Sequence, residues 1–400
     1  MQTDKLPFLS KLYMWTIVLL PVLVQYPIGV LDSDVVLMLV IFFIMLFSSG
    51  KVYITAINKD IFFLLVYIML ITVINILWGH HFSTSLEIVL RTGRYCVYLL
   101  VVFFFGNEKI KYEELMRIYR VMALAASGYL FMQAVFYYGA GIVLPSKIGG
   151  GMENIKGEVG RLRSFFSEPA VFSYSLMPFL ACSLFGKKYS EKNREVNDAI
   201  IVTSAIIIST SGQGILCAAV LWAIWFIERL KSGKVNARML LTLAAMVAIA
   251  FVLYRVGILE FALGRARKVD EGGAVNARMS GYMTLSLLSP LELVFGTGFG
   301  NYVVFNTHGL DLFYETVNYS SIAEFLFTLG ILGTLLWFYF FVKIYKKGNI
   351  GVRMLTIAML ILGTSGCPLT GTFFPLWLTL MCAQLPQGQF SRYSLTLEGS

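Results

Sequence analysis

The chain has 400 residues, of which 58% are hydrophobic and 14% are charged, with a mean hydropathy of +0.74. Soluble domains carry about 25% charged residues, so this composition excludes a water-soluble globular protein. The formal net charge of +9 does not indicate nucleic-acid binding, because Lys and Arg accumulate in the cytoplasmic loops of membrane proteins.

Apolar segments recur along the whole chain, and a helix that crosses a bilayer needs about 20 apolar residues. We therefore predict an all-α polytopic membrane protein with about twelve transmembrane helices, forming one integral membrane domain over residues 1–400. The predicted spans are 12–31, 35–49, 61–78, 89–105, 119–138, 165–184, 199–209, 214–227, 239–254, 322–341, 352–364 and 373–385.

Residues 199–227 could form one long helix or two short ones. The intervening Ser-Thr-Ser-Gly-Gln-Gly sequence at 209–214 has the composition of a turn. A hairpin here places about twice as many Lys and Arg residues inside as outside, whereas one continuous helix nearly removes that bias. The charge distribution therefore favours a hairpin, with both termini cytoplasmic.

Two long loops then lie on the outer (periplasmic or extracellular) side, at 139–164 and 256–319. Long loops are usually functional or disordered. The second contains a mostly apolar run, 282–295, which Pro290 interrupts. This run is too short to span a bilayer easily, and we expect it to lie on the membrane surface or to pack over the helices.

Several arginines fall on the outer side, where orientation alone would place few. Arg91 and Arg94 are three residues apart on one helix face, and Arg161 and Arg163 precede the sixth span. Charged groups at membrane depth are costly and tend to be functional. The alternative for each pair is that the side chains extend to the outer lipid headgroups.

The densest motif is Arg-Leu-Arg-Ser-Phe-Phe-Ser-Glu-Pro at 161–169. Ser167 or Glu168 can cap a helix that starts at Pro169. The start of a helix presents free N–H groups and a partial positive charge, and arginines add forked donors that match phosphate oxygens. The motif therefore predicts a pyrophosphate site. Glu168 could act as a helix cap or as a general base toward a sugar hydroxyl.

Further candidates lie in and after the large outer loop. His308 is a candidate acid or base, with a solvated loop residue as the alternative. Phe-Gly-Thr-Gly-Phe-Gly-Asn at 295–301 lacks the strand–helix context of a nucleotide-binding loop, so a tight turn is the simpler interpretation. We predict that Asn301, Asn318 and Glu324 contact substrate, and we expect Glu324 to need an outer arginine as a partner. Gly330 and Gly333 would allow close helix packing.

With these motifs placed, the chain resembles the bacterial Wzy-type O-antigen and exopolysaccharide polymerases, which share a superfamily with the O-antigen ligases. The string 161–169 is similar to the family's signature before the sixth span. Arg278-Met-Ser and the glycine motif at 295–301 resemble parts of its large outer loop, and 318–333 resembles the end of that loop. Ligases carry a histidine directly before the asparagine at that end, where this chain has Val317.

The resemblance implies that the growing glycan is transferred from undecaprenyl pyrophosphate to the next lipid-linked repeat unit. The departing pyrophosphate would be held by Arg161, Arg163 and Arg278, with Arg91 and Arg94 in reserve, while Glu168 or His308 takes the proton. It implies no metal, cofactor, nucleotide sugar or nucleic acid. Expected partners are membrane lipid, a chain-length regulator and a flippase. An O-antigen ligase, a lipid-linked oligosaccharide flippase and a peptidoglycan-type polymerase remain as alternatives.

Overall fold

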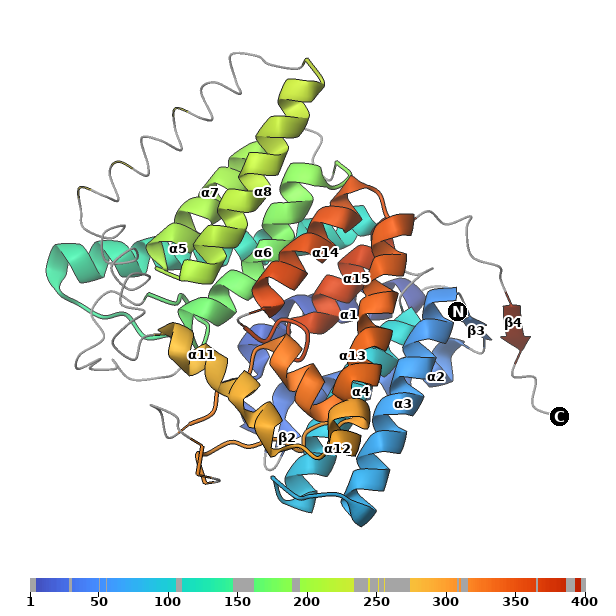
Figure 1. The fold of residues 1–400 in the computed structure, drawn as a ribbon. Helices are drawn as coiled ribbons and strands as arrows, with labels where there is room; N and C mark the ends of the chain where they lie inside the picture. Colours follow the sequence, from blue (N-terminus) through green and yellow to red (C-terminus); the bar gives the residue numbers. More distant parts are fainter. Residues whose placement is uncertain are drawn as a thin grey trace.

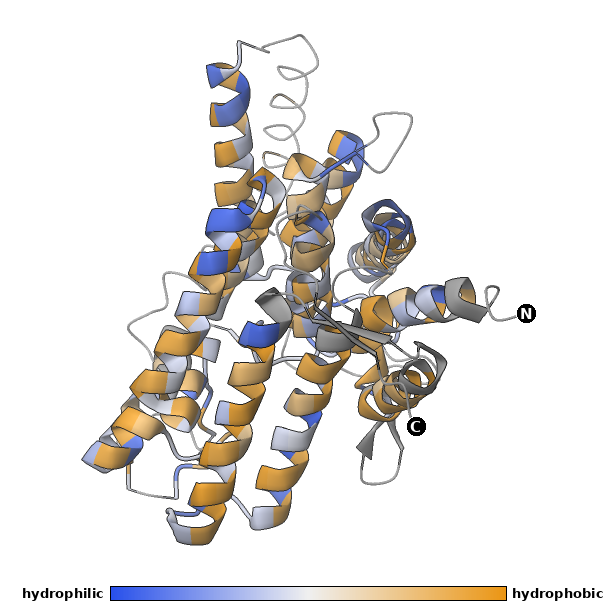
Figure 2. Ribbon diagram, turned by 90° about the vertical axis from the view of Figure 1, so that its right-hand side faces the viewer, coloured by the Kyte–Doolittle hydropathy of each residue, from blue (hydrophilic) through white to orange (hydrophobic). Residues whose placement is uncertain are grey.

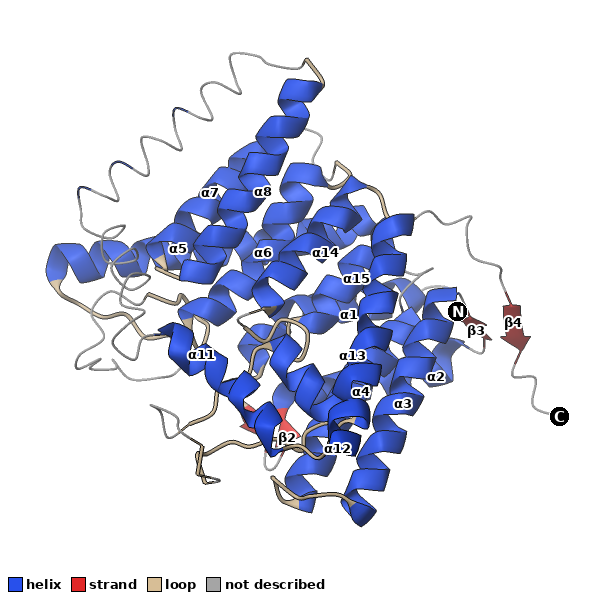
Figure 3. Ribbon diagram, viewed as in Figure 1, coloured by secondary structure: helices blue, strands red, loops and turns tan. Residues whose placement is uncertain are grey.

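The structure is a computed structural model, and most of its described residues are helical (Figure 3). It describes residues 5–28, 31–49, 51–54, 56–105, 110–146, 162–188, 195–233, 274–307, 309–310, 316–364, 366–385 and 393–396, and the single positions 244, 251 and 255. The first eight helices are α1 (Lys5–Leu23), α2 (Ser33–Ser49), α3 (Ala56–Trp78), α4 (Ser85–Phe105), α5 (Tyr112–Ala140), α6 (Pro169–Phe185), α7 (Glu195–Ile208) and α8 (Gly212–Lys231). Then come α11 (Ala274–Met283), the 3-10 turn η1 (Thr284–Leu287), α12 (Pro290–Phe295), α13 (Ser321–Lys347), α14 (Ile350–Gly363) and α15 (Phe374–Gln384).

Four short strands form two antiparallel pairs. β1 (Pro27–Ile28) pairs with β2 (Leu31–Asp32), and β3 (Lys51–Ile54) pairs with β4 (Tyr393–Thr396). The first pair makes a hairpin immediately after α1, so the first helix ends earlier than the predicted span 12–31. The second pair brings two distant segments of the sequence together at one side of the molecule (Figure 1).

The helices are those of a membrane protein. Within the described residues, four are long and apolar enough to cross a bilayer: Lys59–Trp78, Tyr112–Ala140, Gly212–Lys231 and Ser321–Lys347. Shorter apolar helices are Ser10–Leu23, Val35–Ile44, Pro169–Phe185, Ile350–Gly363 and Phe374–Gln384. Each predicted span that falls on described residues overlaps a helix, although several of these helices are shorter than a full crossing. The predicted span 239–254 lies outside the described residues, apart from two single positions.

The surface of the bundle is apolar along much of its length. Figure 2 shows hydrophobic residues over most turns of the helices and hydrophilic residues mainly near their ends. In α3, for example, Phe63, Leu77 and Trp78 are exposed. Side chains of this kind on a helix of spanning length are suited to contact lipid tails, for which no polar group is needed.

The predicted hairpin between the seventh and eighth spans is confirmed as a break between two helices. α7 ends at Ile208 and α8 begins at Gly212. Thr210 between them has φ 57°, and the Ser211 hydroxyl accepts a hydrogen bond from the Gly214 amide at 3.4 Å. A side chain at Gly214 would collide with Ser173 in α6, so the start of α8 packs closely against α6.

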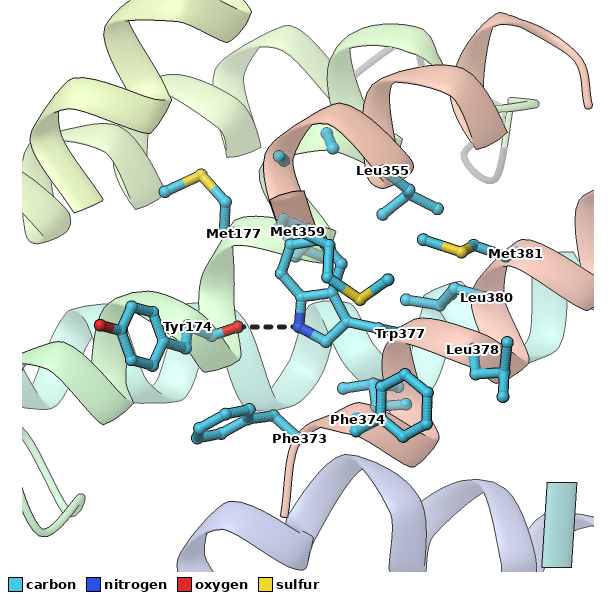
Figure 4. Close-up of a cluster of buried hydrophobic side chains, with 14 of the residues drawn as sticks. Tyr174, Met177, Leu355, Met359, Phe373, Phe374, Trp377, Leu378, Leu380 and Met381 are labelled. Carbon is cyan, nitrogen blue, oxygen red and sulfur yellow. Dashed lines mark hydrogen bonds between the residues drawn. The ribbon is translucent and has the colours of Figure 1, made fainter. Parts of the chain in front are cut away.

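The core lies where α6, α14 and α15 meet (Figure 4). Trp377 of α15 is fully buried among Met177, Met359 and neighbouring apolar side chains. Its indole N–H donates to the Tyr174 carbonyl at 3.2 Å. In a regular helix that carbonyl would accept from the residue four positions on, but this is Pro178, which has no N–H. The tryptophan therefore satisfies a backbone group that the proline leaves unpaired.

A second break in a helix shapes the outer loop. α13 departs from helical geometry at Gly330, with φ 66° and ψ −175°. The glycine motif at 295–301 docks into this break. The Thr297 and Gly298 amides donate to the Phe327 and Thr328 carbonyls at 3.1 and 2.9 Å, and the Tyr67 hydroxyl donates to the Leu329 carbonyl at 2.9 Å. The loop and α3 thus replace the bonds that the break removes.

The predicted tight turn in the glycine motif is confirmed, since the Asn301 amide donates to the Gly298 carbonyl at 3.1 Å, and the same motif also docks against α13. Gly296, Gly298 and Gly300 all have positive φ, and a side chain at Gly296 would collide with the α13 backbone at Thr328 and Gly330. The expectation that the run 282–295 packs over the helices is confirmed, since α12 packs against α13. Gly333 packs against Tyr67 of α3, as predicted for a small residue at a helix contact.

Candidate functional site at the outer end

The starts of α4, α6, α8, α13 and α15 lie at one end of the bundle, which we call the outer end after the predicted orientation. The α3–α4 loop, α11 and α12 lie on this side, toward the bottom and lower left in Figure 1. The opposite, inner end carries the starts of α3, α5, α7 and α14. The first turn of each helix has free N–H groups and a partial positive charge, and both ends carry such turns, so the side chains have to distinguish the outer end from the inner one.

Arg91 is held in place by neutral groups at the outer end of α4. One guanidinium nitrogen, Nη1, donates to the Ser83 hydroxyl and to the Gly300 carbonyl, both at 3.1 Å. The guanidinium lies over the ring of Tyr302, 4.5 Å from its centre, in a cation–π contact. Its contact with the half-exposed Glu87 is long, at 3.9 Å. The positive charge of Arg91 is therefore positioned without a short ion pair.

Tyr302 links the charged residues of this region. Burial raises the pKa of its hydroxyl, the carboxylate of Glu324 raises it further, and Arg91 and Arg94 act in the opposite direction. The Tyr302 hydroxyl thus lies within electrostatic range of three predicted site residues, and it stays protonated at physiological pH. Arg91 acts on Glu324 electrostatically, but no ion pair within 4.0 Å joins Glu324 to an arginine in the described part of the chain, so the predicted partnership stays a prediction.

Glu324 is buried, with 8% of its surface exposed, in the first turns of α13. The Ser320 hydroxyl caps this helix by accepting from the Ala323 amide at 3.2 Å, so Glu324 is not needed as the cap. Its carboxylate is hydrogen-bonded by the Thr370 side chain and feels the charge of Arg91. None of the ion pairs within 4.0 Å in the described part of the chain includes Glu324.

Asn301 has a clear architectural role. Its side-chain oxygen accepts from the Phe82 and Ser83 amides at 2.9 and 3.2 Å, and its nitrogen donates to the His80 and Thr297 carbonyls at 2.7 and 2.8 Å. These four bonds use the full capacity of the amide. Asn301 therefore ties the α3–α4 loop to the glycine motif, and the prediction that it binds substrate is untested.

The 161–169 motif forms a second group of polar side chains, at the start of α6. Arg163 donates from Nε to the Ser146 hydroxyl at 3.0 Å and from Nη1 to the Ser167 carbonyl at 2.8 Å. Glu168 occupies the N-cap position of α6 with extended backbone geometry, yet its side chain makes no capping bond and is exposed. The sequence predicted either a helix cap or a general base at Glu168. The side chain makes no capping hydrogen bond, so the carboxylate is available for chemistry.

The two groups are joined through the interior of the outer end. In α6 the Tyr174 hydroxyl donates to Gln213 at the start of α8, and both side chains pack against Gly366. The Gly366 carbonyl accepts from the Ser321 amide, the first residue of α13, at 2.7 Å. The α14–α15 loop thus connects the helix that follows Arg163 to the helix that carries Glu324.

The structure describes only some of the remaining predicted site residues. Asn318 is exposed, and its backbone is tied to α11 by the Ser280 hydroxyl at 2.9 Å and the Gly281 amide at 3.2 Å. This anchors the end of α11 beside the start of α13. Arg278 belongs to α11, but its side chain lies outside what the structure describes. Arg161 and His308 lie outside the described residues altogether.

Sequence reasoning missed the neutral residues that hold the site. Ser83 and Thr370 have no motif around them, and they were found only through their contacts with Arg91 and Glu324. Tyr302 could have been identified from the sequence as a site residue, because it directly follows the glycine motif that ends at Asn301. Within the described residues, no three His, Cys, Asp or Glu side chains lie together as a metal site would require.

No protein-family model matches the chain. No curated protein matches it significantly in sequence either. The site geometry and the motifs therefore carry the functional argument.

Proposed function

We propose that the protein is a polysaccharide polymerase of the Wzy type in the bacterial inner membrane, with about twelve spans and both termini in the cytoplasm. Its donor is a growing glycan on undecaprenyl pyrophosphate, and its acceptor is a single lipid-linked repeat unit. The observation that carries the proposal is the guanidinium of Arg91, held by neutral groups 4.5 Å from the Tyr302 ring at the same end of the bundle as the buried Glu324.

The leaving group explains why arginines are needed. When the bond from the anomeric carbon to the pyrophosphate breaks, the electron pair stays on the departing oxygen, and negative charge develops there. Positive groups that are already positioned stabilise this charge in the transition state without reorganising. Arg91 meets this condition, since Ser83, Gly300 and Tyr302 fix its guanidinium. Arg163, beside the start of α6, offers a second fixed guanidinium.

The outer location fits the chemistry of the donor. No nucleotide is available on that side of the membrane, so a preactivated lipid-linked sugar has to supply the driving force. The exposed apolar side chains on the helices would let polyprenyl tails approach from within the bilayer. A ligase would use the same donor and a different acceptor, and Val317, in the position where ligases have histidine, argues against it.

An assay with purified protein and lipid-linked repeat units tests the proposal. A polymerase should convert single units into a ladder of longer glycans on the lipid. A ligase should extend nothing unless a lipid-core acceptor is added. A flippase should move the labelled lipid across a vesicle membrane without forming a glycosidic bond. Failure to produce a ladder from a folded sample would overturn the polymerase.

A further inference from the structure

Glu324 has an environment unlike that of any other acidic side chain described at the outer end. It is buried, its direct hydrogen-bond partner is the neutral Thr370 side chain, and Arg91 lies close enough to act on it electrostatically without a direct ion pair. Burying a carboxylate is costly unless it is paired. Among the described residues no cation contacts Glu324 directly, so the fold keeps this carboxylate buried against that cost.

Two other outer carboxylates show what structural and solvated roles look like. Glu292 accepts from the amide and the hydroxyl of Ser289, at 2.9 and 2.7 Å, in the capping box of α12, and it contacts His80 at 3.1 Å. Glu168 is exposed at the start of α6. The carboxylate of Glu292 is therefore occupied and that of Glu168 is solvated, whereas Glu324 is both buried and free of a direct ion pair among the described residues.

We propose that Glu324 is the general base of the polymerisation reaction and accepts the proton of the attacking sugar hydroxyl. This inference rests on the proposed function and assigns the base to a residue other than Glu168 or His308. A carboxylate with remaining lone pairs can accept a hydrogen bond from an incoming hydroxyl, and a base needs to reach the proton it removes. Water competes less for a buried carboxylate than for an exposed one.

The step balances with the groups present. The acceptor oxygen forms a bond to the anomeric carbon of the donor while the bond from that carbon to the pyrophosphate breaks. The electron pair leaves with the pyrophosphate, which the arginines hold, and the hydroxyl proton passes to a Glu324 oxygen. Glu324 returns the proton to water after the product leaves. The Tyr302 ring lies 4.5 Å from the Arg91 guanidinium and 5.2 Å from the ring of Tyr319, just before α13, so the base and this cation lie at the same end of the bundle.

Each substitution changes a different property of a carboxylate at the outer end. Glu324→Gln keeps the size and the hydrogen bond to Thr370 but cannot take a proton. Glu324→Asp keeps the charge and draws it back toward α13. Glu292→Gln is the matched control, because it neutralises another buried outer carboxylate that has a structural role.

The decisive measurement is single-turnover transfer between purified lipid-linked donor and acceptor, with acceptor binding measured separately. We expect Glu324→Gln to slow transfer by about 100-fold or more, the usual contribution of a general base, while binding and thermal stability stay near those of the wild type. Transfer by the wild type should rise with pH on the acidic side, and Glu324→Gln should lose this rise. Glu292→Gln should retain both transfer per folded molecule and the pH dependence.

Transfer by Glu324→Gln within tenfold of the wild type, with an unchanged pH profile, would overturn the assignment and leave the polymerase function intact. If wild-type protein forms no glycosidic bond, the proposed function itself fails. If Glu324→Gln does not fold, Glu324→Asp tests whether Glu324 is the base. We expect it to fold and to transfer at least about tenfold more slowly because the base is misplaced, and wild-type transfer by this variant would reject the base.

Discussion

Arg120 at the inner end and Arg91 at the outer end are held in different ways. At the inner end, acids and bases contact each other directly. Arg120 of α5 donates to Asp198 of α7 at 2.6 and 3.1 Å, and Lys343 of α13 lies 2.5 Å from Asp60 of α3. At the outer end, the close partners of Arg91 are a serine, a carbonyl and an aromatic ring.

This difference distinguishes charged side chains that hold helices together from charged side chains that are available to a ligand. A direct pair neutralises both partners and holds two helices together, so nothing remains for a ligand. A guanidinium fixed by neutral groups keeps its full charge and costs no reorganisation when an anion arrives. The outer end therefore has the properties expected of a site for an anionic leaving group, and the inner end has those of a structural contact.

The largest effect is expected at Arg163. Arg163→Ala should abolish polymer while single repeat units accumulate, because a cation that stabilises the leaving pyrophosphate is lost, at a cost of about 100-fold to 1,000-fold in rate. Arg163→Lys should recover part of the activity, since Lys keeps the charge and lacks the two-pronged geometry. Chain length on gels of lipid-linked glycan measures the outcome.

Arg353 provides the control for Arg163. It is an exposed arginine at the start of α14, stacked at 5.7 Å on Tyr345 at the inner end. Arg353→Ala should leave polymer length unchanged. Equal loss of polymer in both variants would remove the distinction between the two ends.

Arg120→Ala tests the inner end. Asp198 is buried, with 3% of its surface exposed, so breaking its ion pair with Arg120 should cost about 3 kcal/mol of stability. Thermal unfolding in detergent would measure this loss. Adding Asp198→Asn should recover most of it. A stable Arg120→Ala protein with impaired transfer would place chemistry at the inner end and contradict the comparison.

The sequence predicted the helical segments well because each depends on local composition. The break at 209–214 and the start of α6 at Pro169 both follow from turn and capping residues. The prediction of an arginine partner for Glu324 is not met by a direct ion pair among the described residues, where Arg91 acts on it only electrostatically.

What could not be predicted depends on contacts between distant segments. The break in α13 at Gly330 is tolerated only because Thr297, Gly298 and Tyr67 supply donors to its carbonyls. No local pattern reveals such an exchange. The same holds for Trp377, which compensates for a proline in another helix. The roles of Ser83 and Thr370 likewise appear only once α4 and α13 are placed beside their loops.

Gly296→Ala should weaken the attachment of the outer loop to α13. Gly296 has φ 93°, and an added Cβ would meet the Gly330 amide nitrogen at 2.6 Å. Strain of this kind costs about 1–3 kcal/mol, visible as a lower unfolding temperature and faster proteolysis of the loop. Gly128→Ala in α5, where an added Cβ meets nothing within 4 Å, is the control and should be neutral or stabilising. Equal proteolysis of the two variants would show that the loop does not depend on this contact.

The smallest expected effect is an acid sensitivity at Glu292. Its partial burial raises the pKa, but the Ser289 hydroxyl and amide and the nearby His80 outweigh this, so the net pKa lies below the ordinary 4.5. The stabilisation is therefore fully present above pH 4.5 and is lost as the pH falls through the lower folded-state value. Melting temperatures of wild type and Glu292→Gln should converge by a few degrees on acidification, because only the wild type has this contribution to lose. Parallel acid curves would mean that the capping box does not stabilise α12 through its charge.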